Sequence, residues 1–450
     1  MKRRKRGVSA RRGRLAGALA IVLGCVSPLL ARGADAAAAV APAATLLTFA
    51  AIVDGTGEPA SGREIVVEHG VIVAIGESLA ERYPGARRVD LSGLTAIPGL
   101  IDTHVHITYG LSGPSRGDAW HQLLQETPAP ERLVASIGHA AKMLEIGVTT
   151  ARDLFALDHV DFYLRELIER GIVPGPRLFL SGTGIHPLVM PVATSGTEAE
   201  RISSLSQRAR DVADSGAAWL KIFATTGTGS DLSGQRVYHY PEIKAATDIA
   251  HARGLQVAVH AYGPAAVPDA IRAGVDSIEH AVDVDDESLR AWAASGIFYV
   301  PTIDHNRYYA DHREEYGYDD GAERALRAFI SRNVAMLRRA HEAGVPVAMG
   351  SDAVMTMFGE NTRELEWFVA AGMTPGEALR AATLNGAQLL GQQDRLGRLA
   401  PGFAADIVAV TGQPLTDIRA VTRQVVWVMK AGEVMVDKRR TGNPVPPRGK

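Results

Sequence analysis

Short apolar segments alternate with longer amphipathic segments through the middle of the chain. The amphipathic segments repeat apolar residues three and four positions apart, which predicts helices buried on one face. These segments are 131–146, 198–214, 241–253, 264–273, 321–343 and 374–390. The apolar segments between them are rich in Val, Ile and Leu, which favours strands. We expect eight strands, at 99–103, 148–152, 177–180, 219–223, 256–259, 277–279, 298–301 and 346–349.

This alternation over roughly 290 residues predicts an α/β fold, a closed (β/α)8 TIM barrel of parallel strands. A doubly wound open sheet would give the same alternation and is the alternative. We favour the barrel because candidate polar residues follow many different strands. In a barrel, the C-terminal ends of all the strands meet at one mouth, whereas an open sheet would leave most of them far apart.

Both ends of the chain have a different pattern, with short strands separated by turn residues such as Asp54-Gly55-Thr56-Gly57. We expect the two ends to form one small composite β-sandwich. The predicted boundaries are 45–97 and 396–440 for the two parts of the sandwich, 98–395 for the barrel and 441–450 for a tail.

The N-terminus has the organisation of a secretory signal. A basic start is followed by the apolar run Leu15 to Leu30 and the small-residue site Ala34-Asp35-Ala36. We therefore expect a signal peptide at 1–36, an Ala/Pro linker at 37–44, and export to the periplasm or the medium. A membrane anchor is the alternative, although the apolar run is shorter than the roughly 20 residues of a span. Lipidation at Cys25 also stays open.

Charge and cysteine content exclude several functions. The formal net charge is −2, and removal of residues 1–36 would take nine basic residues but one acidic residue, which leaves a more acidic chain. A nucleic-acid partner is therefore not expected. Cys25 is the only cysteine, so the mature chain would have no disulfide, no thiolate nucleophile and no Cys-ligated zinc. A homo-oligomer is compatible with the sequence.

Polar residues that suit metal binding follow several of the predicted strands. His104 and His106 lie two positions apart, so both imidazoles leave one face of the first strand. Imidazole and carboxylate are ligands for zinc and for manganese, cobalt or iron. The remaining candidates at strand ends are Lys221, His260, Tyr262, His280 and Asp352.

Lys221 is the most informative of these residues, because a lysine inside an apolar strand is costly to bury as a cation. A side chain that extends to solvent is the ordinary explanation. A lysine carbamylated by CO2 would instead present a carboxylate that bridges two divalent ions. Six ligands from five strands would then hold two metals.

Several motifs together resemble the amidohydrolase superfamily, in its binuclear, carbamyl-lysine branch. They are Pro98-Gly-Leu-Ile-Asp-Thr-His-Val-His106, Gly147-Val-Thr-Thr-Ala-Arg-Asp-Leu154, Leu220-Lys-Ile-Phe223, Ala273-Gly-Val-Asp-Ser-Ile-Glu-His280, Gly350-Ser-Asp352 and 396–408. The chain is most similar to Xaa-Pro dipeptidases and imidazolonepropionase-like hydrolases. The resemblance implies that His104, His106 and Asp352 bind one ion, that His260 and His280 bind the other, and that carbamylated Lys221 bridges them. Zinc is the expected metal.

The resemblance implies an amidohydrolase that cleaves a C–N amide bond by attack of a metal-bridging hydroxide, and the N-terminal signal pattern adds the expectation that it is exported. Dipeptides or N-acyl amino acids are the expected substrates. Asp352 would act as the base, and Tyr262 would donate to the oxyanion, with simple packing as the alternative for Tyr262. Candidate substrate contacts are His186, His305 and Arg307, with Arg307 as a clamp for a carboxylate and Arg152 as a further residue of the mouth.

Three other functions stay open. Hydrolysis of a cyclic amide or a lactone would use the same centre. Aromatic deamination is disfavoured by Lys221, since deaminase branches usually hold one metal and lack this lysine. A non-catalytic metal-binding barrel protein is the alternative outside enzymes, and it would be expected to lose ligands that this chain retains.

Overall fold

The computed structural model describes residues 44–109, 120–187, 193–229 and 231–441. The predicted signal peptide, Cys25, the linker before Ala44 and the predicted tail after Thr441 lie outside the described residues. Within the described part of the chain, no helix is both long and apolar enough to cross a membrane.

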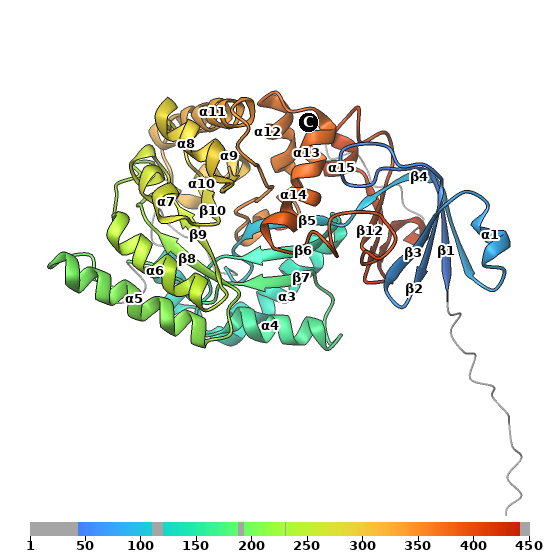
Figure 1. Cartoon of the computed structure of the whole chain (residues 1–450), viewed down its shortest axis with the longest axis horizontal. Helices are drawn as coiled ribbons and strands as arrows, with labels where there is room; N and C mark the ends of the chain where they lie inside the picture. Colours follow the sequence, from blue (N-terminus) through green and yellow to red (C-terminus); the bar gives the residue numbers. More distant parts are fainter. Residues whose placement is uncertain (1–43, 110–119, 188–192, 230, 442–450) are drawn as a thin grey trace, which may run out of the picture. The chain divides into compact units, whose positions relative to one another are not determined.

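The middle of the chain has the predicted α/β fold, with parallel strands in two sheets. One sheet has the order β5-β6-β7 and the other β11-β10-β9-β8 (Figure 1). The strands are β5 (Leu100–Val105), β6 (Val148–Asp153), β7 (Arg177–Leu180), β8 (Trp219–Phe223), β9 (Gln256–His260), β10 (Ser277–Glu279) and β11 (Phe298–Val300). Parallel bridges between single residues link the sheets: Ile185 with Ile222, Tyr299 with Val347, and Val105 with Ala353.

The eighth predicted strand, at 346–349, is reduced to these bridges. Ala348 donates its N–H to the Tyr299 carbonyl (3.0 Å), but Met349 donates to Ala381 at the end of a helix (3.0 Å). Pro346 has no N–H to donate. The segment therefore bonds to neighbouring elements without forming a continuous ladder, and it turns sharply at Asp352, whose φ is 52°.

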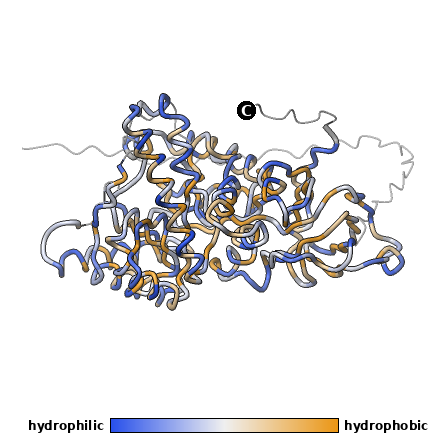
Figure 2. The backbone as a smooth tube through the Cα atoms, turned by 90° about the horizontal axis from the view of Figure 1, so that it is seen from above, coloured by the Kyte–Doolittle hydropathy of each residue, from blue (hydrophilic) through white to orange (hydrophobic). Residues whose placement is uncertain are grey.

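Helices cover the outer side of the strands, with α3 against β6, α4 against β7, α5 against β8 and α6 against β9 (Figure 1). The helices of four or more residues are α1 (Leu79–Arg82), α2 (Trp120–Glu126), α3 (Ala129–Glu145), α4 (Val160–Glu169), α5 (Glu198–Asp214), α6 (Tyr240–Ala252), α7 (Val267–Ala273), α8 (Asp286–Ser295), α9 (Ile303–Asp311), α10 (Arg313–Tyr316), α11 (Asp320–Glu342), α12 (Glu364–Ala370), α13 (Pro375–Ala381), α14 (Leu384–Leu389), α15 (Arg419–Arg423) and the 3-10 helix η4 (Lys438–Thr441). Shorter 3-10 turns are η1 (Pro264–Ala266), η2 (Met355–Met357) and η3 (Asn361–Arg363). Along the chain, hydrophilic and hydrophobic residues are interleaved, as one-sided burial requires (Figure 2).

The segment 374–390, predicted as one helix, forms two. Thr374 and Glu377 form a reciprocal capping box at the start of α13. The break follows Ala381: Ala382 accepts a hydrogen bond from Ile101 (2.7 Å), and the Thr383 hydroxyl donates to the Leu379 carbonyl (2.8 Å). Tertiary hydrogen bonds to β5 therefore interrupt a pattern that reads as continuous in the sequence.

The two ends of the chain form one mixed sheet with the order β14-β13-β12-β4-β1-β2-β3. Its strands are β1 (Thr45–Ile52), β2 (Glu64–Glu68), β3 (Val71–Gly76), β4 (Arg87–Pro98), β12 (Ile407–Val410), β13 (Val425–Lys430) and β14 (Glu433–Asp437). In Figure 1, blue β4 lies beside red β12, in agreement with their antiparallel pairing. The composite origin is as predicted: strands from both ends of the chain pair in one continuous mixed sheet, and their apolar residues share one core. Strand β4, missed because its first half is largely polar and exposed, joins the two ends.

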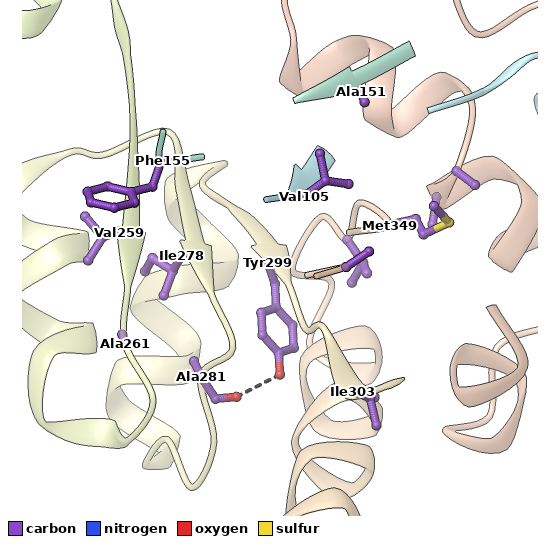
Figure 3. Close-up of a cluster of buried hydrophobic side chains, with 14 of the residues drawn as sticks. Val105, Ala151, Phe155, Val259, Ala261, Ile278, Ala281, Tyr299, Ile303 and Met349 are labelled. Atoms are coloured by element: carbon purple, nitrogen blue, oxygen red, sulfur yellow. Dashed lines mark hydrogen bonds between the residues drawn. The ribbon is translucent and has the colours of Figure 1, made fainter. Parts of the chain in front are cut away.

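An apolar layer packs around the inner strand ends. Val105, Phe155, Val259, Ile278 and Met349 come from different strands and their loops, and all are fully buried (Figure 3). The buried Tyr299 hydroxyl donates to the Ala281 carbonyl (2.7 Å). This layer places the residues that follow each strand on a rigid base.

Asp406 ties the terminal sheet to the α/β part. Its carboxylate accepts from Arg177 Nη1 (2.9 Å), from the Thr149 hydroxyl (3.2 Å) and from the Ala431 N–H (2.8 Å). The side chain is 8% exposed. Three donors from different elements therefore depend on this one buried carboxylate.

We expect Asp406→Ala to lower the free energy of unfolding by about 2 to 3 kcal/mol, because it leaves buried donors unpaired. Denaturant unfolding followed by circular dichroism measures this change. The exposed Asp417→Ala is the matched control and should leave the midpoint unchanged. Equal midpoints for the two variants would contradict the structural role of Asp406.

Candidate metal centre

Three buried side chains from distant parts of the chain form the centre of the site. Donor atoms of His104, His280 and Asp352 all lie within 4.8 Å of one another. His104 belongs to β5, His280 follows β10, and Asp352 follows the segment that bridges to β11. Each of these residues is at most 5% exposed, so the group is largely shielded from solvent.

His106 and His260 extend this group. His106 Nε2 lies 3.1 Å from Asp352 Oδ1, and the ring of His260 lies 4.5 Å from that of His280. Among the described residues, no group hydrogen-bonds to His106 Nδ1, to His260 Nε2 or to Asp352 Oδ1. Buried polar atoms without partners are costly in a native protein, so this donor set fits a divalent cation.

The imidazoles are electrostatically suited to metal binding. Burial lowers the pKa of His104, His106, His260 and His280, so these rings are neutral near pH 7. Neutral imidazole is the form that binds metals. Asp352 is buried too, but the neighbouring imidazoles hold the pKa of this carboxyl below its usual range.

Lys221, on β8, points into the same group. Its Nζ lies 3.4 Å from His104 Nε2 and 5.0 Å from the centre of the Phe223 ring. The side chain is 0% exposed, and within the described chain no carboxylate oxygen lies within 4.0 Å of Nζ. Burial lowers the pKa of Lys221 to about 8. The site therefore holds a buried amine that forms no direct ion pair among the described residues, although the charges of Glu279 and Asp352 act on it.

A buried carboxylate–arginine pair orients the His104 ring through its Nδ1 atom. Glu279 Oε2 lies 2.7 Å from His104 Nδ1, and Glu279 Oε1 accepts from Arg152 Nη2 (2.9 Å) and from the Ser277 hydroxyl. Arg152 also donates to the Thr103 carbonyl and lies over the Trp219 ring. The sequence analysis placed Arg152 at the mouth of the barrel. In the structure, Arg152 lies behind His104, on the side of Glu279. Glu279 holds the His104 ring so that Nε2 faces the other donors.

A second network positions Asp352. Asp102 accepts from the N–H groups of His104 (3.2 Å) and Ser351 (3.0 Å) and from the side chains of Ser351 (2.6 Å) and Asn361 (3.0 Å). Asp352 donates its own N–H to the His104 carbonyl (2.7 Å). Asp352 and His280 have φ values of 52° and 73°, in the left-handed region that is unfavourable for residues other than glycine. Such backbone strain is often found at functional sites.

A cavity of about 450 Å³ opens onto this group. Its lining includes His186, Tyr262 and His305 together with His106, His260, His280 and Asp352. Tyr262 donates its hydroxyl to Asn306 (3.0 Å), and His305 Nδ1 hydrogen-bonds to the Asp352 carbonyl (2.8 Å). The remaining lining has an apolar or aromatic part, from Tyr109, Phe223, Val237, Tyr309, Val354 and Met355, and a polar part, from Thr194, Thr225, Thr226, Thr228, Asp231, Gln235 and Arg236.

Known proteins share this architecture. A family model described as the amidohydrolase family matches residues 95–435. The chain belongs to the amidohydrolase family. An ochratoxinase from Aspergillus niger is 26% identical over 425 residues, which cover 87% of this chain and 86% of that protein.

Two solved structures are similar to this chain over most of its length. A Xaa-Pro dipeptidase with methionine bound in its active site is 28% identical, with a TM-score of 0.76 over 87% of this chain and 99% of the other. A prolidase complexed with N-methylphosphonate-L-proline is 26% identical, with a TM-score of 0.77 over 87% and 99%. Together with the buried His and Asp group, these matches identify a metal-dependent amidohydrolase that acts on C–N bonds.

The structure brings together most residues of this amidohydrolase that the sequence singled out. Arg307 is the exception, because it does not line the cavity: its guanidinium binds Asp304 on two atoms and also reaches Asp311 and Glu360. It cannot serve as a carboxylate clamp without breaking these ion pairs. The sequence analysis missed Glu279, although a glutamate in an apolar strand carries the same signal as Lys221.

We expect Glu279→Gln to weaken metal binding by about 10- to 100-fold, because an amide orients and polarises His104 less well than a carboxylate. Competition with a chromogenic chelator measures the affinity. The surface variant Glu323→Gln, which removes a carboxylate paired with Arg327, is the control. If both variants held metal as tightly as the wild type, Glu279 would not tune the site.

Proposed function

We propose that the protein hydrolyses the amide bond of dipeptides or N-acyl amino acids at a binuclear metal centre. This proposal rests on one observation: four imidazoles, Asp352 and buried Lys221 converge at a cavity that can hold a molecule of this size, and His106, His260, His280 and Asp352 line it. The likeness to a Xaa-Pro dipeptidase and a prolidase supports this substrate class.

A closed (β/α)8 barrel is the proposed scaffold. The three parallel bridges link β7 to β8, β11 to the segment at Val347, and the segment at Ala353 back to β5. Such a ring would place all candidate ligands at the C-terminal ends of the strands, which is where barrel enzymes carry their active sites.

The proposed division of ligands is the one that the family resemblance implies. His104, His106 and Asp352 would hold one ion, and His260 and His280 the other. Lys221 would bridge them as a carbamate, which removes the buried cation and supplies the missing carboxylate. Zinc ions held there would polarise the substrate carbonyl and lower the pKa of a bound water.

Asp352 would accept a proton on a carboxylate oxygen and deliver it to the leaving nitrogen. Its lowered pKa keeps the carboxylate ionised near pH 7. His305, held by the Asp352 carbonyl through Nδ1, would steady the backbone of this residue. Tyr262 and His186 line the cavity and would orient the substrate carbonyl.

A cyclic amide or lactone would fit the same centre, so substrate class is tested directly. The enzyme reconstituted with zinc is assayed against dipeptides, N-acyl amino acids, a hydantoin and a lactone.

The export predicted from residues 1–36 is proposed as well, which would make the protein a scavenger of extracellular peptides.

We expect the open-chain amides to be cleaved, and Asp352→Asn to lower kcat by at least about 100-fold, because the amide cannot accept the proton. Steady-state kinetics and circular dichroism measure turnover and folding. Selective turnover of the cyclic substrates would favour the alternative, and wild-type turnover by Asp352→Asn would refute the role of this residue.

Carbamylation makes metal loading depend on CO2. We expect chelator-treated protein to take up two equivalents of zinc when bicarbonate is supplied and fewer in CO2-free buffer. Carbon-13 bicarbonate should give a carbamate signal in the NMR spectrum that is absent from Lys221→Met. Full loading without CO2 and no labelled carbamate would exclude the modification.

A further inference from the structure

A hairpin between β8 and α6 covers one side of the cavity. Thr225 and Arg236 form an antiparallel bridge, and the Thr226 N–H donates to the Gln235 carbonyl (2.8 Å). The base of the hairpin is tied to the metal site, because the Thr225 hydroxyl accepts from the Tyr262 N–H (2.9 Å) and Ala224 donates to the His260 carbonyl (3.1 Å). Arg236 therefore has a fixed backbone position near the candidate ligand His260 and near Tyr262.

Two glycines press this hairpin against the end of β9. A Cβ atom on Gly227 would lie 2.6 Å from Tyr262 Cβ, and one on Gly234 would lie 2.8 Å from the Gly263 nitrogen. Both glycines have positive φ, 119° and 57°. The close approach that only glycine permits holds the hairpin over the cavity.

Arg236 has unused hydrogen-bond donors at this position. Its Nη1 donates to Asp269 (3.0 Å) and lies 3.4 Å from His239 Nδ1. Within the described chain, no acceptor hydrogen-bonds to its Nε or Nη2. Asp269 thus anchors one nitrogen of the guanidinium, while the others stay available to a planar two-oxygen group.

No other lysine or arginine shares this position. Arg236 is the one Arg or Lys among the described residues that line the cavity. Arg307 is bound by three carboxylates, and Lys221 lies among the metal ligands. The side chain of Arg236 is 36% exposed, which leaves it accessible to a ligand in the cavity.

We propose that Arg236 binds the free carboxylate of the substrate and selects amides that carry one. The assignment rests on the amide hydrolysis proposed above and adds to it a group that recognises the C-terminal half of the substrate. Arg236 holds the carboxylate, and the scissile carbonyl then faces the metal ligands. Arg236 is a specificity-determining residue and takes no part in proton transfer.

A binding experiment tests the proposal independently of catalytic turnover. L-phenylalanine, chosen for the aromatic wall, and L-phenylalaninol, which lacks the carboxylate, are titrated into the zinc-loaded protein by calorimetry. We expect Arg236→Met to weaken L-phenylalanine binding by about 10- to 100-fold and to leave L-phenylalaninol binding unchanged. Equal affinity of the wild type for the two compounds, or an unchanged affinity of Arg236→Met for L-phenylalanine, would overturn the proposal.

Kinetics separate this proposal from a structural role of Arg236. For N-acetyl-L-phenylalanine we expect Arg236→Met to raise KM by a similar factor with little change in kcat, whereas KM for the carboxamide analogue should stay constant. Arg272→Met is the matched control, since Arg272 contacts the same Asp269 but does not line the cavity. An equal rise in KM for both substrates, or the same effect from Arg272→Met, would indicate disturbed folding of the hairpin and overturn the proposal.

The two proposals fail in different ways. A wild-type protein that cleaves neither substrate but binds L-phenylalanine through Arg236 would refute amide hydrolysis and retain the carboxylate site. A wild-type protein that cleaves both substrates with equal KM would retain amide hydrolysis and refute the carboxylate site.

Discussion

The burial of imidazole nitrogens without protein partners is the constraint on which this structure depends. His106, His260 and Asp352 each have an atom without a hydrogen-bond partner among the described residues, and the amine of Lys221 lies 3.4 Å from His104 Nε2. Such groups would destabilise a fold that served only stability. Their concentration at one end of the strands makes sense when the missing partners are cations, and the family membership agrees with this interpretation.

The surrounding protein holds these donors in place through buried charge. The Arg152–Glu279 pair reaches His104 from one side, while Asp102 joins β5 to the loop of Asp352 from another. Each carboxylate is fully buried and accepts from several donors, which offsets the cost of removing it from water. The left-handed backbone of His280 and Asp352 is tolerated because these networks and the apolar layer beneath leave few alternative positions.

Two groups of residues line the cavity. One consists of candidate metal ligands and Tyr262, and the other belongs to the hairpin that carries Arg236. Because Gly227 and Gly234 bring the hairpin against Tyr262 and Gly263, the backbone fixes how the two groups lie relative to each other. Loops of this kind allow one metal centre to serve many amides within a shared scaffold.

The sequence alone determined the α/β class, the pairing of the chain ends and the candidate ligands, because strand periodicity and polar residues after apolar strands are local signals. The sequence pointed to Arg307, which does not line the cavity, and did not single out Arg236, which does, nor Glu279 and strand β4. The ion pairs of an arginine depend on carboxylates that are distant in sequence. Glu360 pairs with Arg307, and Asp269 pairs with Arg236. Those neighbours meet only when the chain folds, so the ion pairs, and with them the charge that faces a substrate, were decided by the tertiary structure.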